Sequence, residues 1–229
     1  MRFHFLTSPT LPRLSWCARI DRGEETVRVR CGNWVETTED SFSEAAWDGE
    51  FSRSQPDLAL TMTGTAARLS QESITFATST NLHDRLYFYP EKDSLWVSNS
   101  LAFVLVEADD EPDLDFPYYT GEWLSQLMAG IQRENRSLPM KRGEVILHEC
   151  ANLTVGPDLE ITRHEKPTPP EPRNYDEYFE LLSQTINGVL KNARSPGRAR
   201  PYSPLGTISR GYDAPAIVSL ARSEGCREA

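Results

Sequence analysis

Short runs of alternating polar and apolar residues dominate the first 105 residues and constrain the fold more than any other feature. Turn-forming residues separate these runs, and helical periodicity is nearly absent among them. A side-chain period of two is typical of strands with one buried face. The runs are RFHFL, WCARI, TVRVRC, LALTMT, SITFAT, RLYFYP and SLWVSNS. The sequence therefore predicts a β-rich first unit of antiparallel strands, with its clearest hairpin over residues 84–98.

The pattern changes beyond this β-rich part. The acidic stretch at residues 107–115 (EADDEPDLD) predicts a solvated linker rather than a metal site, because blocks of like charge usually stay in water. Apolar residues then recur at helical spacing over residues 123–131, and GEVILHE and LEITRHE predict two more strands around a turn at Gly156 and Pro157.

A proline-rich connector at residues 167–173 marks the expected domain boundary, since its composition is that of an extended spacer. It separates a first unit, residues 1–166, from a second, residues 174–229. The second unit begins with a helical apolar pattern from Tyr175 to Leu190. A strand-like run at residues 204–208 and a helical run at 214–223 follow. This order predicts the beginning of an α/β nucleotide-binding domain.

One strand cannot complete a parallel sheet, and its two flanking helices would leave apolar faces exposed. We therefore expect this chain to be the N-terminal part of a longer protein, and the isolated second unit not to fold.

The net charge of the chain argues against two classes of partner. A formal net charge of −10 argues against a protein that chiefly neutralises nucleic acid or anionic lipid. No apolar run approaches the ~20 residues of a membrane span, and the N-terminus lacks a signal-peptide core, so we expect a cytoplasmic location. The cysteines and histidines show neither CxxC nor metal-ligand spacing, which predicts free thiols and ordinary histidines. These residues are Cys17, Cys31, Cys150, Cys226, His4, His83, His148 and His164.

A candidate phosphate site precedes the last helix. In GTISRGYDAPAIVSLA, Ser209 offers a hydroxyl, Gly211 permits close approach of the backbone, and Asp213 can cap the helix or hold Mg²⁺. Backbone N–H groups at a helix N-terminus favour phosphate. The same pattern also fits an ordinary capped turn. Elsewhere, Asp84 and Arg85 could form an acid/base pair, but a structural ion pair is the simpler interpretation.

The loop resembles the Ser-Gly-Gly-x-Asp-Ser pyrophosphate loop of the ATP-pyrophosphatase superfamily. The helix YFELLSQTINGVL, the segment NLHDRLYFYPEKDSLWVSNSLAFVL and residues 119–164 are similar to parts of asparagine synthetases. The resemblance implies a glutamine amidotransferase-like first domain of stacked sheets and an apparently truncated ATP-binding domain. The nucleotide-binding residues that it implies are Ile208, Ser209, Arg210, Gly211, Tyr212, Asp213 and Ala214.

Relatives of this kind adenylate a carboxylate with ATP and Mg²⁺, and an amine then attacks the acyl-adenylate. The resemblance therefore implies a small-molecule or peptide carboxylate substrate and an amine donor, with a homodimer left open, while the charge and the lack of an apolar span predict no nucleic acid and no membrane as partners. Asp213 is the implied Mg²⁺ ligand.

The chain departs from the family at several positions. Arg2 stands where the family exposes its catalytic cysteine, and Cys31-Gly32-Asn33 is a poor substitute within a predicted strand. The Asn-Gly-Glu glutamine signature is also missing, so we expect the glutaminase to be lost. In the loop, Arg210 replaces a glycine and Ala214 replaces a serine. Two alternatives stay open: a silent paralogue acting as a scaffold, and an unrelated β-rich domain with a helical tail.

Overall fold

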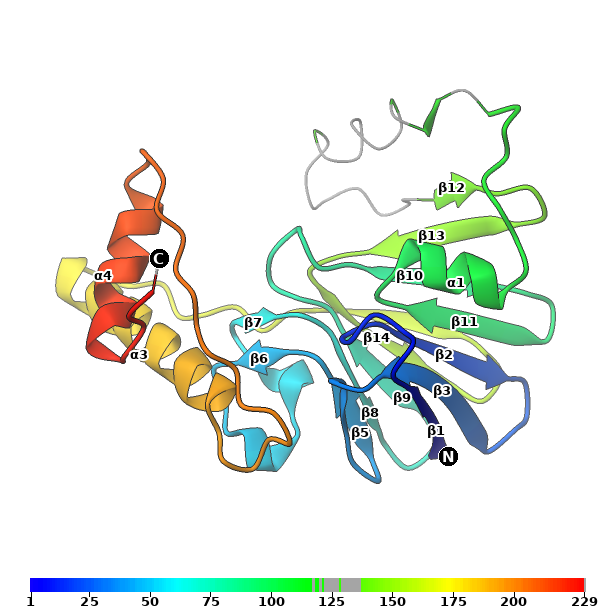
Figure 1. Cartoon of the computed structure of the whole chain (residues 1–229), viewed down its shortest axis with the longest axis horizontal. Helices are drawn as coiled ribbons and strands as arrows, with labels where there is room; N and C mark the ends of the chain where they lie inside the picture. Colours follow the sequence, from blue (N-terminus) through cyan, green and yellow to red (C-terminus); the bar gives the residue numbers. More distant parts are fainter. Residues whose placement is uncertain (117, 120, 122–127, 129–136, 229) are drawn as a thin grey trace.

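The computed structural model describes residues 1–116, 118–119, 121, 128 and 137–228. It shows a mixed α+β protein, mostly β, with two open sheets of seven and six strands and three helices within the described residues (Figure 1). The helix predicted over residues 123–131 falls, apart from residue 128, outside the described residues. Within the described residues, no helix combines the length and apolar character needed to cross a bilayer.

The seven-stranded sheet has the order β1-β3-β2-β11-β10-β13-β12. Its strands are β1 (Arg2–Ser8), β2 (Trp16–Asp21), β3 (Thr26–Gly32), β10 (Leu86–Pro90), β11 (Ser94–Ser98), β12 (Ser137–Pro139) and β13 (Glu144–His148). The predicted hairpin is confirmed, because β10 and β11 pair antiparallel with Tyr87 opposite Ser98. The expectation of purely antiparallel sheets is wrong at one edge, where β1 runs parallel to β3. The chain passes from β1 through β2 before it reaches β3, and this connection allows β1 and β3 to run parallel. The strand β2 lies on the other side of β3 and runs antiparallel to it.

The six-stranded sheet has the order β15-β14-β9-β8-β5-β4, and β6 pairs with β7 in a separate ribbon. These strands are β4 (Glu36–Thr37), β5 (Ser41–Ser43), β6 (Ala46–Trp47), β7 (Met62–Thr63), β8 (Ala66–Leu69), β9 (Ile74–Ala77), β14 (Ala151–Val155) and β15 (Ile161–Glu165). One expectation fails here, and another is incomplete. The run LALTMT does not form a single strand, because its first residue, Leu58, ends the 3-10 helix η2 (Pro56–Leu58). Only the last two residues of the run, Met62 and Thr63, form β7. The predicted strands GEVILHE and LEITRHE do form, but the unpredicted β14 lies between them and pairs with β15.

The main core lies between the two sheets. Alternate residues of β3, Val27, Val29 and Cys31, are fully buried and pack with Trp16 of β2 against Phe42 and Phe76 of the other sheet. Burying one large apolar side chain contributes about 1.5–3 kcal/mol, so this layer accounts for much of the stability. The helix α1 (Leu101–Glu107) covers the face of the seven-stranded sheet that points away from the main core. The β6–β7 ribbon covers the outer face of the six-stranded sheet in the same way.

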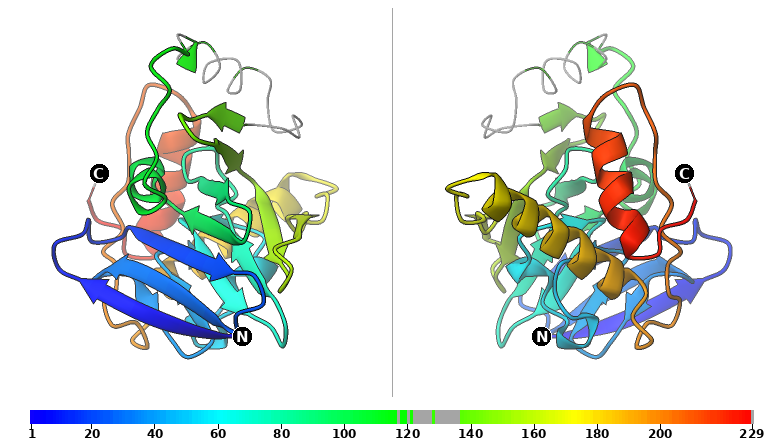
Figure 2. Two further views of the ribbon diagram at one scale, coloured as in Figure 1. Left: turned by 90° about the vertical axis from the view of Figure 1, so that its right-hand side faces the viewer. Right: turned by 90° about the vertical axis from the view of Figure 1, so that its left-hand side faces the viewer.

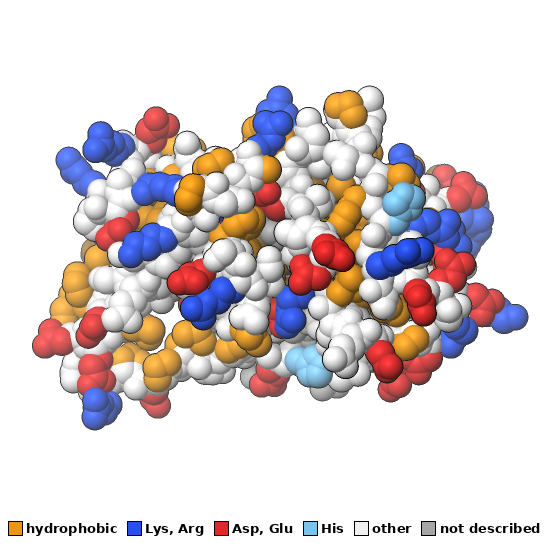
Figure 3. All heavy atoms as spheres, turned by 90° about the horizontal axis from the view of Figure 1, so that it is seen from below, with side chains coloured by type: hydrophobic (Ala, Val, Ile, Leu, Met, Phe, Trp, Pro, Cys, Tyr) orange, Lys and Arg blue, Asp and Glu red, His pale blue; other side chains and the backbone are white. Residues whose placement is uncertain are grey.

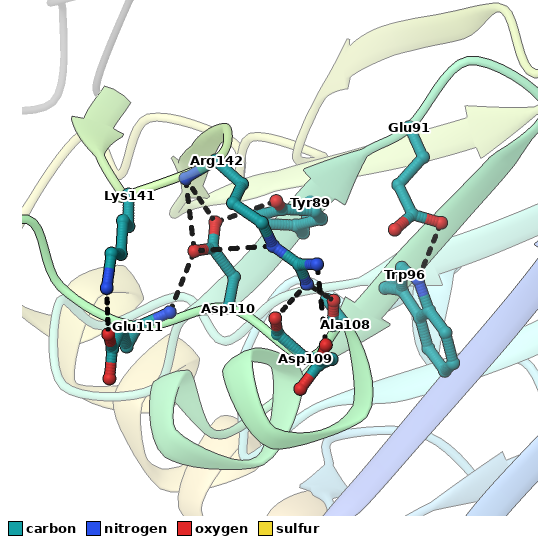
Figure 4. Close-up of polar contacts among 9 residues, drawn as sticks. All are labelled: Tyr89, Glu91, Trp96, Ala108, Asp109, Asp110, Glu111, Lys141 and Arg142. Carbon is teal, nitrogen blue, oxygen red and sulfur yellow. Dashed lines mark hydrogen bonds and ion pairs between the residues drawn. The ribbon is translucent and has the colours of Figure 1, made fainter.

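The acidic stretch after α1 is partly buried, which corrects the expectation of a solvated linker. Asp110 is 9% exposed, accepts a 2.7 Å hydrogen bond from the Tyr89 hydroxyl, and also accepts from the backbone N–H of Arg142 (Figure 4). These bonds hold the pKa of Asp110 below its usual value despite burial, whereas burial and the bond to Asp110 raise the pKa of Tyr89 to about 12. Lys141 pairs with Glu111 beside them. The stretch is therefore fastened to the turn before β13.

Two helices form the end of the molecule away from β1. They are α3 (Tyr175–Ala193) and α4 (Asp213–Ser223), which lie side by side (Figures 1 and 2). Asn174 caps α3, because its side chain accepts from the Glu177 N–H at 3.0 Å. Hydrophobic atoms reach the surface at this end, among interspersed acidic and basic side chains (Figure 3). Among these side chains, Tyr175 is 73% exposed and Ile217 is 44% exposed.

The second unit is docked on the first by bonds to its backbone. Arg198, only 4% exposed, donates from Nη2 to the Ala45 carbonyl at 2.7 Å. Asn192 donates to the Gly49 carbonyl at 2.8 Å, and the Tyr202 hydroxyl to the Glu44 carbonyl at 3.3 Å. Residues 192–202 thus lie along residues 44–49.

Limited proteolysis is expected to cut first between Glu165 and Arg173, since this connector has no regular secondary structure. Because the docking bonds lie outside the connector, the two fragments should then elute together in size-exclusion chromatography. Early cleavage before Leu105, with the connector intact, would show that the boundary is misplaced.

Candidate functional site

The predicted nucleotide loop is an exposed segment at the start of α4. Ser209, Arg210, Gly211 and Tyr212 are all exposed, and Tyr212 reaches 94%. The Gly211 N–H donates to the Ser209 hydroxyl at 3.3 Å, which closes a small turn directly before the helix. The loop therefore presents its polar atoms outward.

The strand predicted at residues 204–208 is not formed. Leu205 makes a single parallel bridge to Glu228, where Gly206 donates to the Glu228 carbonyl at 2.9 Å. Ile208, expected to end a buried strand, is 68% exposed. A strand needs a partner along its whole length, and the described residues supply one only at Leu205.

The N-terminus of α4 is open, which corrects the expectation that Asp213 caps it. Tyr212 holds the capping position and no side chain caps the helix within the described residues; Asp213 is the first helical residue. The N–H groups of Asp213 and Ala214 have no acceptor among the described residues. Pro215 removes the next N–H. The arrangement leaves two amides and the positive end of the helix dipole for an anion.

A metal site is not preformed in the part of the chain that the structure describes. No group of three or more His, Cys, Asp or Glu side chains there could hold a metal ion. Asp213 could thus contribute to Mg²⁺ binding only together with phosphate oxygens and water, as is usual for this ion.

Arg2 and Cys31 are the two positions on which the expected loss of the glutaminase depends. Arg2 begins an edge strand, where its Nε donates to the Thr26 hydroxyl at 3.2 Å. Cys31 is fully buried in β3, and burial raises the pKa of its thiol. Neither residue offers an exposed thiolate.

A partly buried polar network that the sequence did not reveal joins the two sheets. We call it the Glu44 network; its members are Trp16, Glu44, Thr65 and Asn99. One carboxylate oxygen of Glu44 accepts from the Thr65 N–H at 2.7 Å, the Thr65 hydroxyl at 2.5 Å and the Asn99 side chain at 3.3 Å. Trp16 donates from Nε1 to the Thr65 hydroxyl at 3.0 Å.

Burial raises the pKa of Glu44 to about 7, although the bonds from Thr65 and Asn99 oppose this shift. The nearby Asp84 carboxylate adds to the rise. Gly64 lies between the two carboxylates with φ of 80° and donates its N–H to Asp84 at 2.9 Å. A carboxyl that titrates near neutrality often marks a functional site, but Trp16 and Thr65 are 0% and 1% exposed. Glu44 and Asn99 are themselves half-buried, and the effect that we test for this network is the one on stability.

The proposed ion pair of Asp84 with Arg85 is not formed. Arg85 pairs with Glu149 at 2.5 Å, and both side chains are nearly buried. Asp84 instead accepts from the backbone of Gly64.

No protein-family model matches the sequence, and the comparison with curated proteins also gives no match. The functional conclusion therefore depends on the geometry of the loop, the open helix and the likeness of the motifs.

Proposed function

We propose that this chain belongs to an asparagine synthetase-like, ATP-dependent amide ligase that forms an acyl-adenylate. The observation that carries the proposal is the exposed loop from Ser209 to Tyr212 in front of the uncapped N-terminus of α4. Two amides and one arginine without partners among the described residues meet there, which suits a phosphate chain. In this proposal the first unit is an amidotransferase-like domain of stacked sheets that has lost its glutaminase.

Each loop residue has a defined part in the proposal. The amides of Asp213 and Ala214 bind phosphate oxygens, and the Ser209 hydroxyl can donate its own hydrogen to phosphate while it accepts from the Gly211 N–H. Arg210 has no ion-pair partner among the described residues and is free to contact phosphate. The Asp213 carboxylate would repel phosphate directly, so it contributes through Mg²⁺. The carboxylate substrate then attacks the α-phosphorus, pyrophosphate leaves, and an amine displaces AMP.

ATP with Mg²⁺ is expected to bind the intact protein, and Arg210→Ala to weaken this binding by about 1–3 kcal/mol, the range for a lost charge-assisted hydrogen bond. The variant Arg210→Gly distinguishes an effect of the arginine side chain on phosphate from an effect of backbone flexibility in the loop. If the side chain contacts phosphate, both variants weaken; if the loop only needs a glycine, Arg210→Gly tightens binding. Calorimetric titration measures both, with Arg173→Ala near the start of α3 as a charge-matched control.

The second candidate function is a catalytically silent scaffold. The absent strand under the loop and the amide removed by Pro215 favour it, because both weaken a phosphate site. No binding of ATP by the wild-type protein would support the scaffold and exclude the ligase.

A further inference from the structure

Two arginines from opposite ends of the chain converge on one indole ring. The guanidinium carbon of Arg13 lies 4.5 Å from the centroid of the Trp34 ring, and that of Arg200 lies 5.2 Å from it. Arg13 belongs to the loop before β2, and Arg200 to the segment that docks the second unit. Both are exposed, and Trp34 is half-buried.

Neither guanidinium is neutralised by the described part of the protein. No carboxylate of the described residues lies within ion-pair distance of Arg13 or Arg200. The nearest acidic group that the contacts define is Glu36, whose two oxygens accept from the backbone N–H groups of Ala199 and Arg200 at 3.1 and 3.2 Å. Both of its oxygens are thus engaged with main chain. In a protein with net charge −10, two such cations on one ring are a local exception.

The backbone holds both arginines in place. The Trp34 N–H donates to the Arg13 carbonyl at 2.9 Å, and the Ser15 N–H donates to the Pro12 carbonyl at 3.0 Å. Gly32 allows this close approach, since a Cβ atom there would lie 2.5 Å from the Arg13 carbonyl oxygen. Glu36 fixes the other arginine through its backbone amide. The backbone positions of both arginines are therefore set before any ligand arrives.

Stacking on an aromatic ring occupies the face of a guanidinium and leaves its in-plane N–H groups free. Those groups match pairs of oxygens on a phosphate. The two guanidinium carbons cannot lie farther apart than the sum of their distances to the centroid of the Trp34 ring. A phosphate or a pyrophosphate group can span such a separation. We propose that Arg13, Trp34 and Arg200 form a binding site for a phosphate or pyrophosphate group, separate from the loop before α4.

The site would also couple ligand binding to docking, because its two cations come from different units. An anion between them adds an attraction across the contact that Arg198 and Glu36 already make. Binding should therefore raise the stability of the whole chain by mass action.

Titration calorimetry with inorganic phosphate and with pyrophosphate, at ionic strength held constant with sodium chloride, tests the proposal. Saturable binding is expected, and Arg13→Gln or Arg200→Gln should each raise the Kd of this site about tenfold, near the lower limit for one charge-assisted contact. Trp34→Leu should also weaken binding, because it removes the ring that holds both guanidiniums. All three side chains reach the surface, so circular dichroism should show intact folds.

Two control variants distinguish a specific site from general attraction of anions to surface arginines. Arg173→Gln removes an exposed arginine that pairs with Glu177 of α3 and should leave Kd unchanged, whereas Arg210→Ala should weaken only the binding of pyrophosphate at the nucleotide loop. Equal weakening by Arg173→Gln would overturn the proposal in favour of non-specific attraction. The absence of saturable binding of either anion to the wild-type protein would also overturn it, whereas the nucleotide loop is tested separately by the titration of wild type and Arg210→Ala with ATP.

Discussion

Replacing Arg198 with alanine is expected to lower the free energy of unfolding by about 3 kcal/mol, the largest effect of any single change considered for this chain. The guanidinium donates to the Asn192 carbonyl at 2.8 Å, the Ala45 carbonyl at 2.7 Å and the Asn192 side-chain oxygen at 2.5 Å. Its central carbon also lies 4.3 Å from the centroid of the Phe51 ring. Truncation would leave three acceptors without this donor and a space beside the ring.

The loss of unfolding free energy in Arg198→Ala is limited, because the substitution also removes a buried positive charge. Burial lowers the pKa of Arg198, which shows that its charged form is poorly solvated where it lies. Alanine relieves this desolvation, so the net loss is smaller than the sum of three broken bonds. Arg198→Lys keeps the charge but not the planar arrangement of donors, and should fall between wild type and alanine.

Urea unfolding at neutral pH measures the effect, with Arg173→Ala as the control. Arg173 is 85% exposed at its side chain and pairs with Glu177 one helical turn away, so its loss should change stability little. A change for Arg198→Ala as small as that of the control would show that Arg198 does not hold the two units together.

Local patterns in the sequence predict much of the first unit. The alternation in TVRVRC places Val27, Val29 and Cys31 on the buried face of β3, and the turn at residues 90–93 leads to the β10–β11 hairpin. The strand β14 escapes prediction because Asn152 and Thr154 interrupt its apolar run. The structure buries Asn152 through a hydrogen bond to the Asp57 carbonyl, 95 residues earlier in the chain. No local pattern contains that partner.

The polar sites depend even more on distant partners. The Glu44 network brings together residues up to 83 positions apart, and none of its members stands in a recognisable motif. Arg198 lies in SPGRARP, whose composition is that of a solvated loop, yet it is buried. The nucleotide loop is the reverse case: its sequence is recognisable, but the strand expected beneath it is absent because pairing partners are lacking among the described residues.

The pH dependence of stability should change when Glu44 is replaced by glutamine. The folded protein raises the pKa of Glu44 from 4.5 to about 7. The stabilisation linked to its protonated form is therefore fully present below pH 4.5 and is lost as the pH rises through 7. At about 1.4 kcal/mol per pKa unit, the loss is at most about 3 kcal/mol by about pH 8.

Glutamine keeps an oxygen that can accept from Thr65 and Asn99 but does not titrate. The stability of Glu44→Gln relative to wild type should therefore increase between about pH 5 and pH 8, by up to about 3 kcal/mol. Burial also lowers the pKa of His148 to about 4, which costs stability as the pH falls from 6.5. His148 is present in both proteins, so its contribution cancels in the difference.

Urea unfolding of both proteins at several pH values across this range gives the difference directly. Glu50→Gln is the matched control, because Glu50 is exposed and pairs with Arg53 three residues away. Its difference from wild type should stay constant with pH. Parallel stability curves for Glu44→Gln and wild type would mean that Glu44 titrates at its ordinary pKa, and that the Thr65 and Asn99 donors fully compensate for the burial of its carboxylate.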